Sequence, residues 1–155
     1  MKNTLRVVVS FALVFGAVVL ASFFITPQAS SWYAALVKPD FTPPNLVFAF
    51  VWVILYVLMA FALASAWMHK VDTTFRRWSF TFTLQLGLNI LWAVLFFGLH
   101  GLFLPAIDSI ALWFAVIVLT VDSWDIDRLS FWLLIPYLAW MTFAMILSIA
   151  IWWVN

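Results

Sequence analysis

The sequence is poor in charge and has no cysteine. Only 8% of its 155 residues are Asp, Glu, Lys or Arg, whereas about 25% is usual for a soluble domain. The absence of cysteine excludes a disulfide framework, a cysteine-ligated metal and a thiol nucleophile. The net charge of +1 gives no strong field that would attract nucleic acid, so we expect no nucleic-acid partner.

Apolar side chains are abundant instead. Hydrophobic residues make up 68% of the chain, and 11 of the residues are tryptophan. A water-soluble fold could not bury this much apolar surface, so we expect an integral membrane protein. The apolar runs are continuous, whereas the strands of an outer-membrane β-barrel alternate polar and apolar residues over segments of about 10 residues. The composition therefore predicts an all-α membrane protein.

Polar breaks divide the chain into five apolar runs, each near the roughly 20 residues that a spanning helix needs. We expect one domain over residues 1–155, a single bundle of five transmembrane helices. The expected helices are approximately 5–26, 45–69, 75–98, 104–121 and 129–154, with a long linker over 27–44. The first run is longer than the about 7–15 apolar residues of a signal peptide, so we interpret it as a true span. Thr42 is expected to cap the second helix, with Pro43 at its first position.

The basic residues predict an orientation. Those on the N-terminal side of the expected bundle are Lys2, Arg6, Lys70, Arg76, Arg77 and Arg128, which leaves Lys38 alone on the other side. The positive-inside rule then places the N-terminus in the cytoplasm of a multi-pass protein.

Aromatic residues recur at helical spacing in three of the expected helices. Side chains three or four residues apart share one face of a helix. The second helix carries Phe48, Trp52 and Tyr56, the third Asn89, Trp92 and Phe96, and the fifth Tyr137, Trp140, Ala144 and Ser148. Packing between helices explains any one of these faces. Three together favour a cavity for a flat hydrophobic ligand, with a few polar contact points.

Ionisable residues within the spans are few. Asp108 follows Pro105 closely, and we interpret it as a first-turn residue that complements the helix dipole. The alternative is a functional intramembrane carboxylate. His69 and His100 lie at span ends without partner ligands, so we expect no metal site and no cofactor. No Ser-His-Asp set, paired carboxylates or phosphate-binding loop is present, so no conventional catalytic residues are predicted.

Four segments resemble a known family. "WYAALVKP" followed by "PP", then "VWVILYVLMAFA", "NILWAVLFFG" and "PYLAWMTFAMILS" stand in the order typical of the translocator protein family, also called tryptophan-rich sensory proteins. The resemblance implies a five-helix protein of a bacterial cell membrane, commonly a homodimer. It also implies binding of porphyrins, haem-related tetrapyrroles, sterols and synthetic benzodiazepine-site ligands inside the bundle, under a lid formed by the linker between helices 1 and 2.

The resemblance also assigns residues. It implies that Tyr33, Pro43, Trp52 and Tyr56 form the lid and one wall, and that Asn89, Trp92, Trp140 and Ala144 form the opposing wall. The helical spacing adds Phe48 and Ser148 to the expected binding residues. The expected lid also contains Trp32, Lys38, Pro39 and Pro44. Ser148 departs from the Asn usual in the family, which implies a weaker polar contact. No basic residue follows Tyr137, so a cholesterol-type pattern is missing there.

Three functions remain open on the sequence. The first is a receptor or transport-linked protein for porphyrins. The second is an enzyme that degrades porphyrin with light or oxygen and uses Trp52 and Trp140 as redox partners. The third is a structural or regulatory module whose aromatics only pack. Thr83 and Gly87 form a small-xxx-small pair that would suit a helix–helix contact in a dimer.

Overall fold

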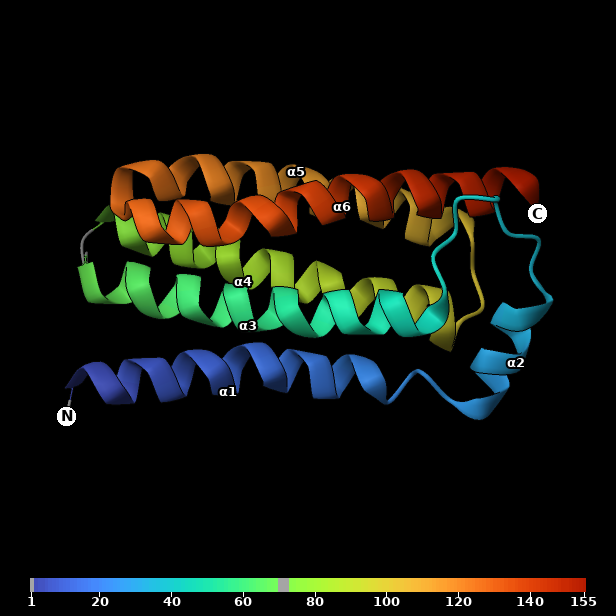
Figure 1. Cartoon of the computed structure of the whole chain (residues 1–155), viewed down its shortest axis with the longest axis horizontal. Helices are drawn as coiled ribbons and strands as arrows, with labels where there is room; N and C mark the ends of the chain where they lie inside the picture. The colour runs from blue at the N-terminus through green and yellow to red at the C-terminus, as the bar shows by residue number, and fades with distance from the viewer. Residues whose placement is uncertain (1, 70–72) are drawn as a thin grey trace.

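A computed structural model describes residues 2–69 and 73–155, and this part of the chain is helical without β-strands (Figure 1). Lys70, which the orientation argument used, lies outside the described residues. The elements are α1 (Lys2–Ser22), α2 (Pro27–Ala35), α3 (Asn45–His69), α4 (Thr73–Ala93), the π-helical turn η1 (Val94–Gly98), α5 (Phe103–Ile126) and α6 (Arg128–Val154). Five helices, all except the short α2, are long and apolar enough to cross a membrane. The predicted fold class is confirmed.

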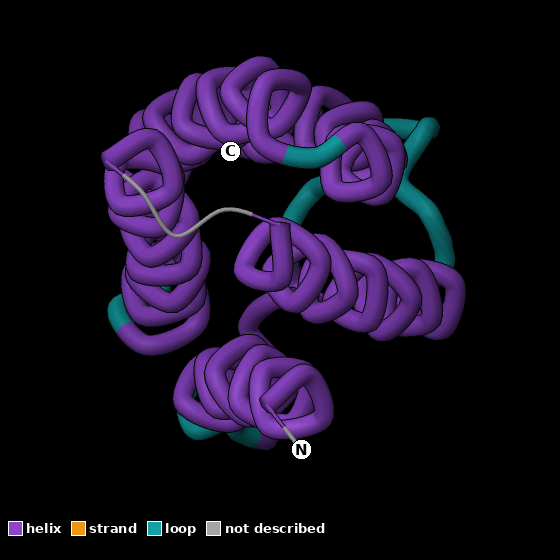
Figure 2. The backbone as a smooth tube through the Cα atoms, turned by 90° about the vertical axis from the view of Figure 1, so that its left-hand side faces the viewer, coloured by secondary structure: helices purple, strands orange, loops and turns teal. Residues whose placement is uncertain are grey.

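The five long helices close into a ring (Figure 2). Helix α1 packs on α3, α3 on α6, α6 on α5, α5 on α4, and α4 on α1. The N-terminus and the C-terminus lie at opposite ends of the bundle, and α2 lies at the C-terminal end (Figure 1). The chain segments before and after α2 connect α1 to α3 across that end.

The first two boundaries differ from the expected ones. Helix α1 ends at Ser22 rather than at 26, and the linker over 27–44 contains α2. The Thr26 hydroxyl accepts a hydrogen bond from the Ala29 N–H at 3.2 Å, and Pro27 occupies the first turn. A threonine cap followed by proline is a helix-start signal, because the capped N–H has no partner inside the helix and proline needs none. The same pair therefore begins α2 rather than continuing α1.

The expected cap of the second long helix is wrong. Helix α3 begins at Asn45, its first turn closes with the Phe48 N–H donating to the Pro44 carbonyl at 3.0 Å, and the Thr42 hydroxyl is buried without a hydrogen-bond partner. A proline disfavours helical backbone in the residue before it, so Pro44 keeps Pro43 out of the helix.

The fourth expected helix, 104–121, extends to Ile126 as α5. The additional residues include Asp122 and Asp125, which the expected bounds leave outside the helix. In the structure the Asp122 carboxylate accepts a hydrogen bond from Arg77 on α4 at 2.8 Å. An ion pair at the end of the bundle lets a charged turn remain helical.

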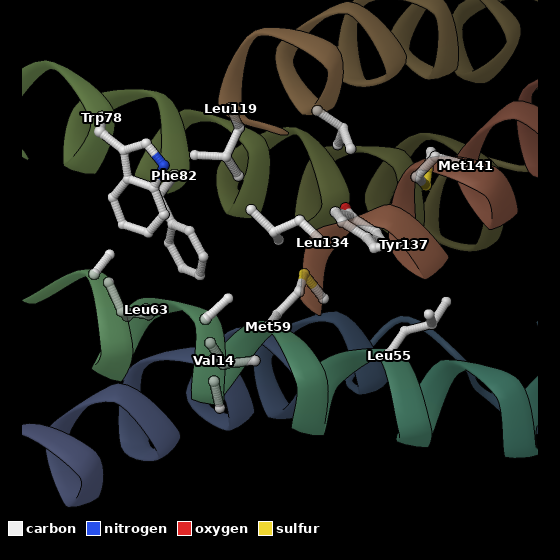
Figure 3. Packing of buried hydrophobic residues seen from close by; sticks show 14 of the residues in the cluster. Val14, Leu55, Met59, Leu63, Trp78, Phe82, Leu119, Leu134, Tyr137 and Met141 are labelled. Carbon is white, nitrogen blue, oxygen red and sulfur yellow. The ribbon is translucent and has the colours of Figure 1, made fainter. Parts of the chain in front are cut away.

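Half of the bundle, on the N-terminal side, is solidly packed, and we call it the packed half. Its buried side chains include Met59, Leu63, Trp78, Leu119 and Leu134 (Figure 3). The Trp78 Nε1–H donates to the Ser123 hydroxyl at 2.7 Å, so the largest of these side chains is fully buried and still hydrogen-bonded. The polar atom of this side chain is therefore paired, as most buried polar groups in folded proteins are.

Candidate functional site

The half of the bundle next to α2 contains a cavity of about 480 Å³ and is called the cavity half. This volume lies in the range of about 300–1,000 Å³ that is usual for small-molecule pockets. The lining comes from every helix: Phe15, Val18, Ala21, Ser22, Ile25, Ser30, Tyr33, Asn45, Phe48, Ala49, Trp52, Val53, Tyr56, Asn89, Trp92, Ala93, Phe96, Phe97, Ser109, Leu112, Met141, Ala144, Leu147, Ser148 and Ile151. In the part of the chain that the structure describes, none of these side chains is charged.

Stacked aromatic rings form two walls of the cavity. Trp52 stacks on Tyr56 along α3, with ring centroids 5.4 Å apart and planes 28° apart. Trp92 stacks on Phe96 at the end of α4, at 4.7 Å and 11°. Each pair is four residues apart, so the helix itself aligns the rings. The walls are therefore flat and apolar.

A row of hydrogen bonds runs from the cavity into the packed half. The Tyr56 hydroxyl donates to the Asn89 carbonyl oxygen at 2.8 Å, and the Asn89 amide donates to the Tyr137 hydroxyl at 3.5 Å. The Tyr137 hydroxyl donates in turn to the Gln85 carbonyl oxygen at 2.8 Å. Because Tyr137 gives its single hydrogen to Gln85, it can only accept from Asn89. The second amide hydrogen of Asn89, a residue of the cavity lining, has no hydrogen-bond partner among the described residues.

A second polar point lies across the cavity. The Trp92 Nε1–H donates to the Ser148 hydroxyl oxygen at 3.4 Å. The contact is longer than the usual range of about 2.7–3.2 Å of an N–H···O hydrogen bond. The Ser148 hydroxyl hydrogen can still donate toward a ligand.

Helix α2 and the segment after it lie over the end of the cavity half. The Trp32 ring stacks on His100 with centroids 4.7 Å apart, which joins α2 to the turn before α5. Tyr33 packs edge-on against Phe96 and Phe97, and burial raises the pKa of its hydroxyl, which stays protonated. Lys38 Nζ lies 4.6 Å from the centroid of the Tyr33 ring.

The structure brings most of the predicted site residues around this one cavity. Those that line it are Tyr33, Phe48, Trp52, Tyr56, Asn89, Trp92, Ala144 and Ser148, whereas Pro43 and Trp140 do not. Trp140 lies behind Phe48, with ring centroids 5.5 Å apart, and its Nε1–H is buried without a hydrogen-bond partner. The residues predicted to form a lid, Trp32, Lys38, Pro39 and Pro44, also lie outside the lining, in α2 and the segment after it.

Sequence reasoning missed the contributions of α1 and α5, such as Phe15, Val18 and Ser109. These residues sit in uniformly apolar runs, where no polar landmark distinguishes one face from another. The first-turn interpretation of Asp108 is wrong. Helix α5 begins at Phe103, so Asp108 lies in the second turn, buried and with Oδ2 unpaired, beyond the first turn in which a helix dipole acts strongly.

Comparisons with known proteins agree on one family. The model of the TspO/MBR family matches residues 8–154. The chain is 40% identical over 153 residues to "Tryptophan-rich protein TspO" of Archaeoglobus fulgidus, which covers 99% of both chains. It is 33% identical over 126 residues to "Protein CrtK" of Rhodobacter capsulatus (81% of this chain, 79% of the relative). It is 31% identical over 135 residues to "Translocator protein" of Homo sapiens (86% and 80%).

Proposed function

The chain belongs to the TspO/MBR family of multi-pass membrane proteins, and from that premise we propose that it is a receptor or transport-linked protein for porphyrins and related tetrapyrroles. The cavity between the aromatic walls of α3 and α4 carries this proposal. A porphyrin is a flat, largely apolar ring. Flat aromatic walls bury such a ring through stacking, and the few polar groups fix its orientation.

The proposal includes the membrane and the orientation. Arg6, Arg76, Arg77 and Arg128 lie at the end of the bundle opposite α2. A cytoplasmic location for that end of the bundle follows from the positive-inside rule, with α2 on the outer face of a bacterial cell membrane. The end of the cavity half beneath α2 and the segment after it, which we call the mouth, would then face the exterior or periplasm.

A homodimer is part of the same proposal. Thr83 and Gly87 are exposed on α4, and a Cβ added at Gly87 would meet no atom within 4 Å. A second helix can approach closely along such a stripe of small residues. Crosslinking in native membranes tests this part, and finding only monomers would contradict it.

Titration with protoporphyrin in detergent tests ligand binding. Bound porphyrin should quench tryptophan emission and change its own absorption band. Trp52→Phe should weaken binding, because Trp52 lines the cavity. Trp140→Phe should weaken it less, since Trp140 lies behind Phe48. Trp132→Phe is the matched control, because Trp132 is exposed near the start of α6. Unchanged emission in the native protein, or equal affinity in all three variants, would refute the proposal.

A second candidate is degradation of porphyrin with light or oxygen. It is favoured by the indole of Trp52, which lines the cavity and can donate an electron to an excited ligand. In this candidate the porphyrin spectrum should decay faster with the protein than without it, and Trp52→Phe should slow the decay. Equal decay with and without protein would exclude the enzyme.

A further inference from the structure

The cavity and its proposed ligand differ in charge. Protoporphyrin carries two carboxylates on one edge of its ring, whereas the lining contains no charged side chain within the described residues. A carboxylate buried without a cation or hydrogen bonds costs several kcal/mol, on the order of the desolvation of a single ion. The charged edge of the ligand must therefore lie outside the apolar lining, at the mouth.

Lys38 lies at that end, in the segment after α2, and its Nζ is 4.6 Å from the centroid of the Tyr33 ring, which lines the cavity. Its Nζ donates to the Ala34 and Leu36 carbonyls at 3.3 and 3.4 Å, and it faces the ring of Tyr33. An ammonium has three N–H donors, so one is left over. No ion pair to Lys38 is found among the residues that the structure describes. The positive charge at the mouth is thus held in place and not neutralised by a carboxylate.

The backbone beside Lys38 is fixed from the far end of the chain. The Asn155 side chain accepts a hydrogen bond from the Val37 N–H at 3.0 Å and donates one to the Val37 carbonyl at 2.9 Å. On the other side Pro39 restricts Lys38 to extended backbone. Because both neighbours are held, little conformational freedom is lost when the ammonium meets an anion.

We propose that the Lys38 ammonium binds a carboxylate of the ligand at the mouth of the cavity, while the apolar ring lies between the aromatic walls. This inference rests on the proposed function and specifies the ligand class as a flat apolar ring with an anionic edge. Tyr33 lies between the cavity and the ammonium, because its ring lines the cavity and also contacts Lys38 Nζ.

The test compares protoporphyrin with its dimethyl ester, which keeps the ring and removes both charges. Affinities are measured in a neutral, phosphate-free detergent for the native protein, Lys38→Met and Lys38→Arg. The native protein should bind the free acid about tenfold more tightly than the ester, as expected for one charge-assisted hydrogen bond. Lys38→Met should remove this preference by weakening only the acid, and Lys38→Arg should retain most of it. Arg76→Met, at the opposite end of the bundle, should change nothing.

The outcomes separate the two proposals. If neither compound binds the native protein, the proposed function fails and this inference with it. If both bind and Lys38→Met leaves the acid-to-ester ratio unchanged, only the role of Lys38 fails. Equal weakening of acid and ester in Lys38→Met also overturns it, because Lys38 would then act on the lid or on a lipid phosphate. Repeating the titration in bilayers with and without phosphatidylglycerol identifies the lipid case.

Discussion

The packed half and the cavity half are built from the same kinds of residue, yet the cavity of about 480 Å³ lies in the second. Both contain tryptophan and phenylalanine at helical spacing. In the packed half, Trp78 stacks on Phe82 and fills the centre of the ring of helices. In the cavity half, Trp52 and Trp92 stack along their own helices and leave the centre open. Aromatic spacing alone therefore does not distinguish a core from a pocket.

The contact between α3 and α6 differs between the two halves. Helix α3 buries Ala60, Ala62, Ala64 and Ala66 in the packed half, which lets neighbouring helices approach. The Ser130 hydroxyl of α6 donates to the Ala62 carbonyl of α3 at 2.8 Å. The cavity half has no comparable contact between α3 and α6 among the described residues. There the two helices meet mainly through aromatic rings.

The largest difference between the halves should appear when a tryptophan is removed. Trp78→Ala should cost about 3–5 kcal/mol of unfolding free energy, as other buried aromatic deletions do. Trp52→Ala should cost less than half as much, because one side of its ring already faces empty space. Thermal or denaturant unfolding in detergent measures both. Equal losses would mean that the cavity half is packed as tightly as the other half.

Replacing an alanine by leucine should have opposite consequences in the two halves. Ala62→Leu should destabilise the protein by about 1–3 kcal/mol through overpacking, and the folded fraction should bind porphyrin normally. Ala144→Leu should leave stability nearly unchanged, because the added atoms enter the cavity. It should weaken porphyrin binding at least tenfold, or about 1.4 kcal/mol. Melting curves and titrations on both variants provide the check, and normal binding by Ala144→Leu would count against the site.

The row of polar groups between the halves should behave as a unit. Gln85→Met leaves the buried Tyr137 hydroxyl without its acceptor, which should cost about 1–3 kcal/mol. Tyr137→Phe leaves Gln85 unsatisfied in the same way. The double variant should cost clearly less than the sum, because neither orphaned group remains. Strictly additive losses in a double-mutant cycle would show that the two side chains act independently.

The smallest effect concerns Asp127, at the end of the packed half. Burial alone would raise its pKa, but hydrogen bonds from the Ser65 hydroxyl and from the backbone N–H of Ser130 outweigh burial and hold the pKa below its ordinary value. A depressed folded-state pKa contributes stability above the ordinary Asp value of about 3.9, and this stability is lost as the pH falls further. Asp127→Ala should cost about 1 kcal/mol as a lost helix cap. The melting temperature of the Asp127→Ala variant should vary less with pH below about 4 than that of the native protein.

The sequence predicted the long helices because continuous apolar runs and charged breaks are strong signals. It predicted several tryptophan, tyrosine and polar residues of the cavity lining for a related reason. Trp52, Tyr56, Asn89 and Ser148 are unusual in apolar helices, and their spacing places them on inward faces. Trp140 obeys the same spacing but lies behind Phe48, because spacing fixes a face and not the depth of a side chain within the bundle.

The remaining features depend on contacts that no local pattern reveals. The hydrogen bonds of Asn155 to Val37 join residues that are 118 positions apart. Helix α3 begins at Asn45 because Pro44 disfavours helical backbone at Pro43. The prediction of a cap at Thr42 did not take this restriction into account. Asp108 lies in the second turn because α5 begins before Pro105. Only the three-dimensional structure shows that its Oδ2 has no hydrogen-bond partner.

The central claim is that porphyrin occupies the cavity half. The methionine methyl groups test it, because the ring current of a bound porphyrin shifts nearby methyl resonances. Met141 lines the cavity, whereas Met68 lies near the end of α3 in the packed half. With the two signals assigned through Met141→Leu and Met68→Leu, saturating porphyrin should shift the Met141 methyl strongly and leave Met68 in place. A shifted Met68 with an unchanged Met141 would contradict the account.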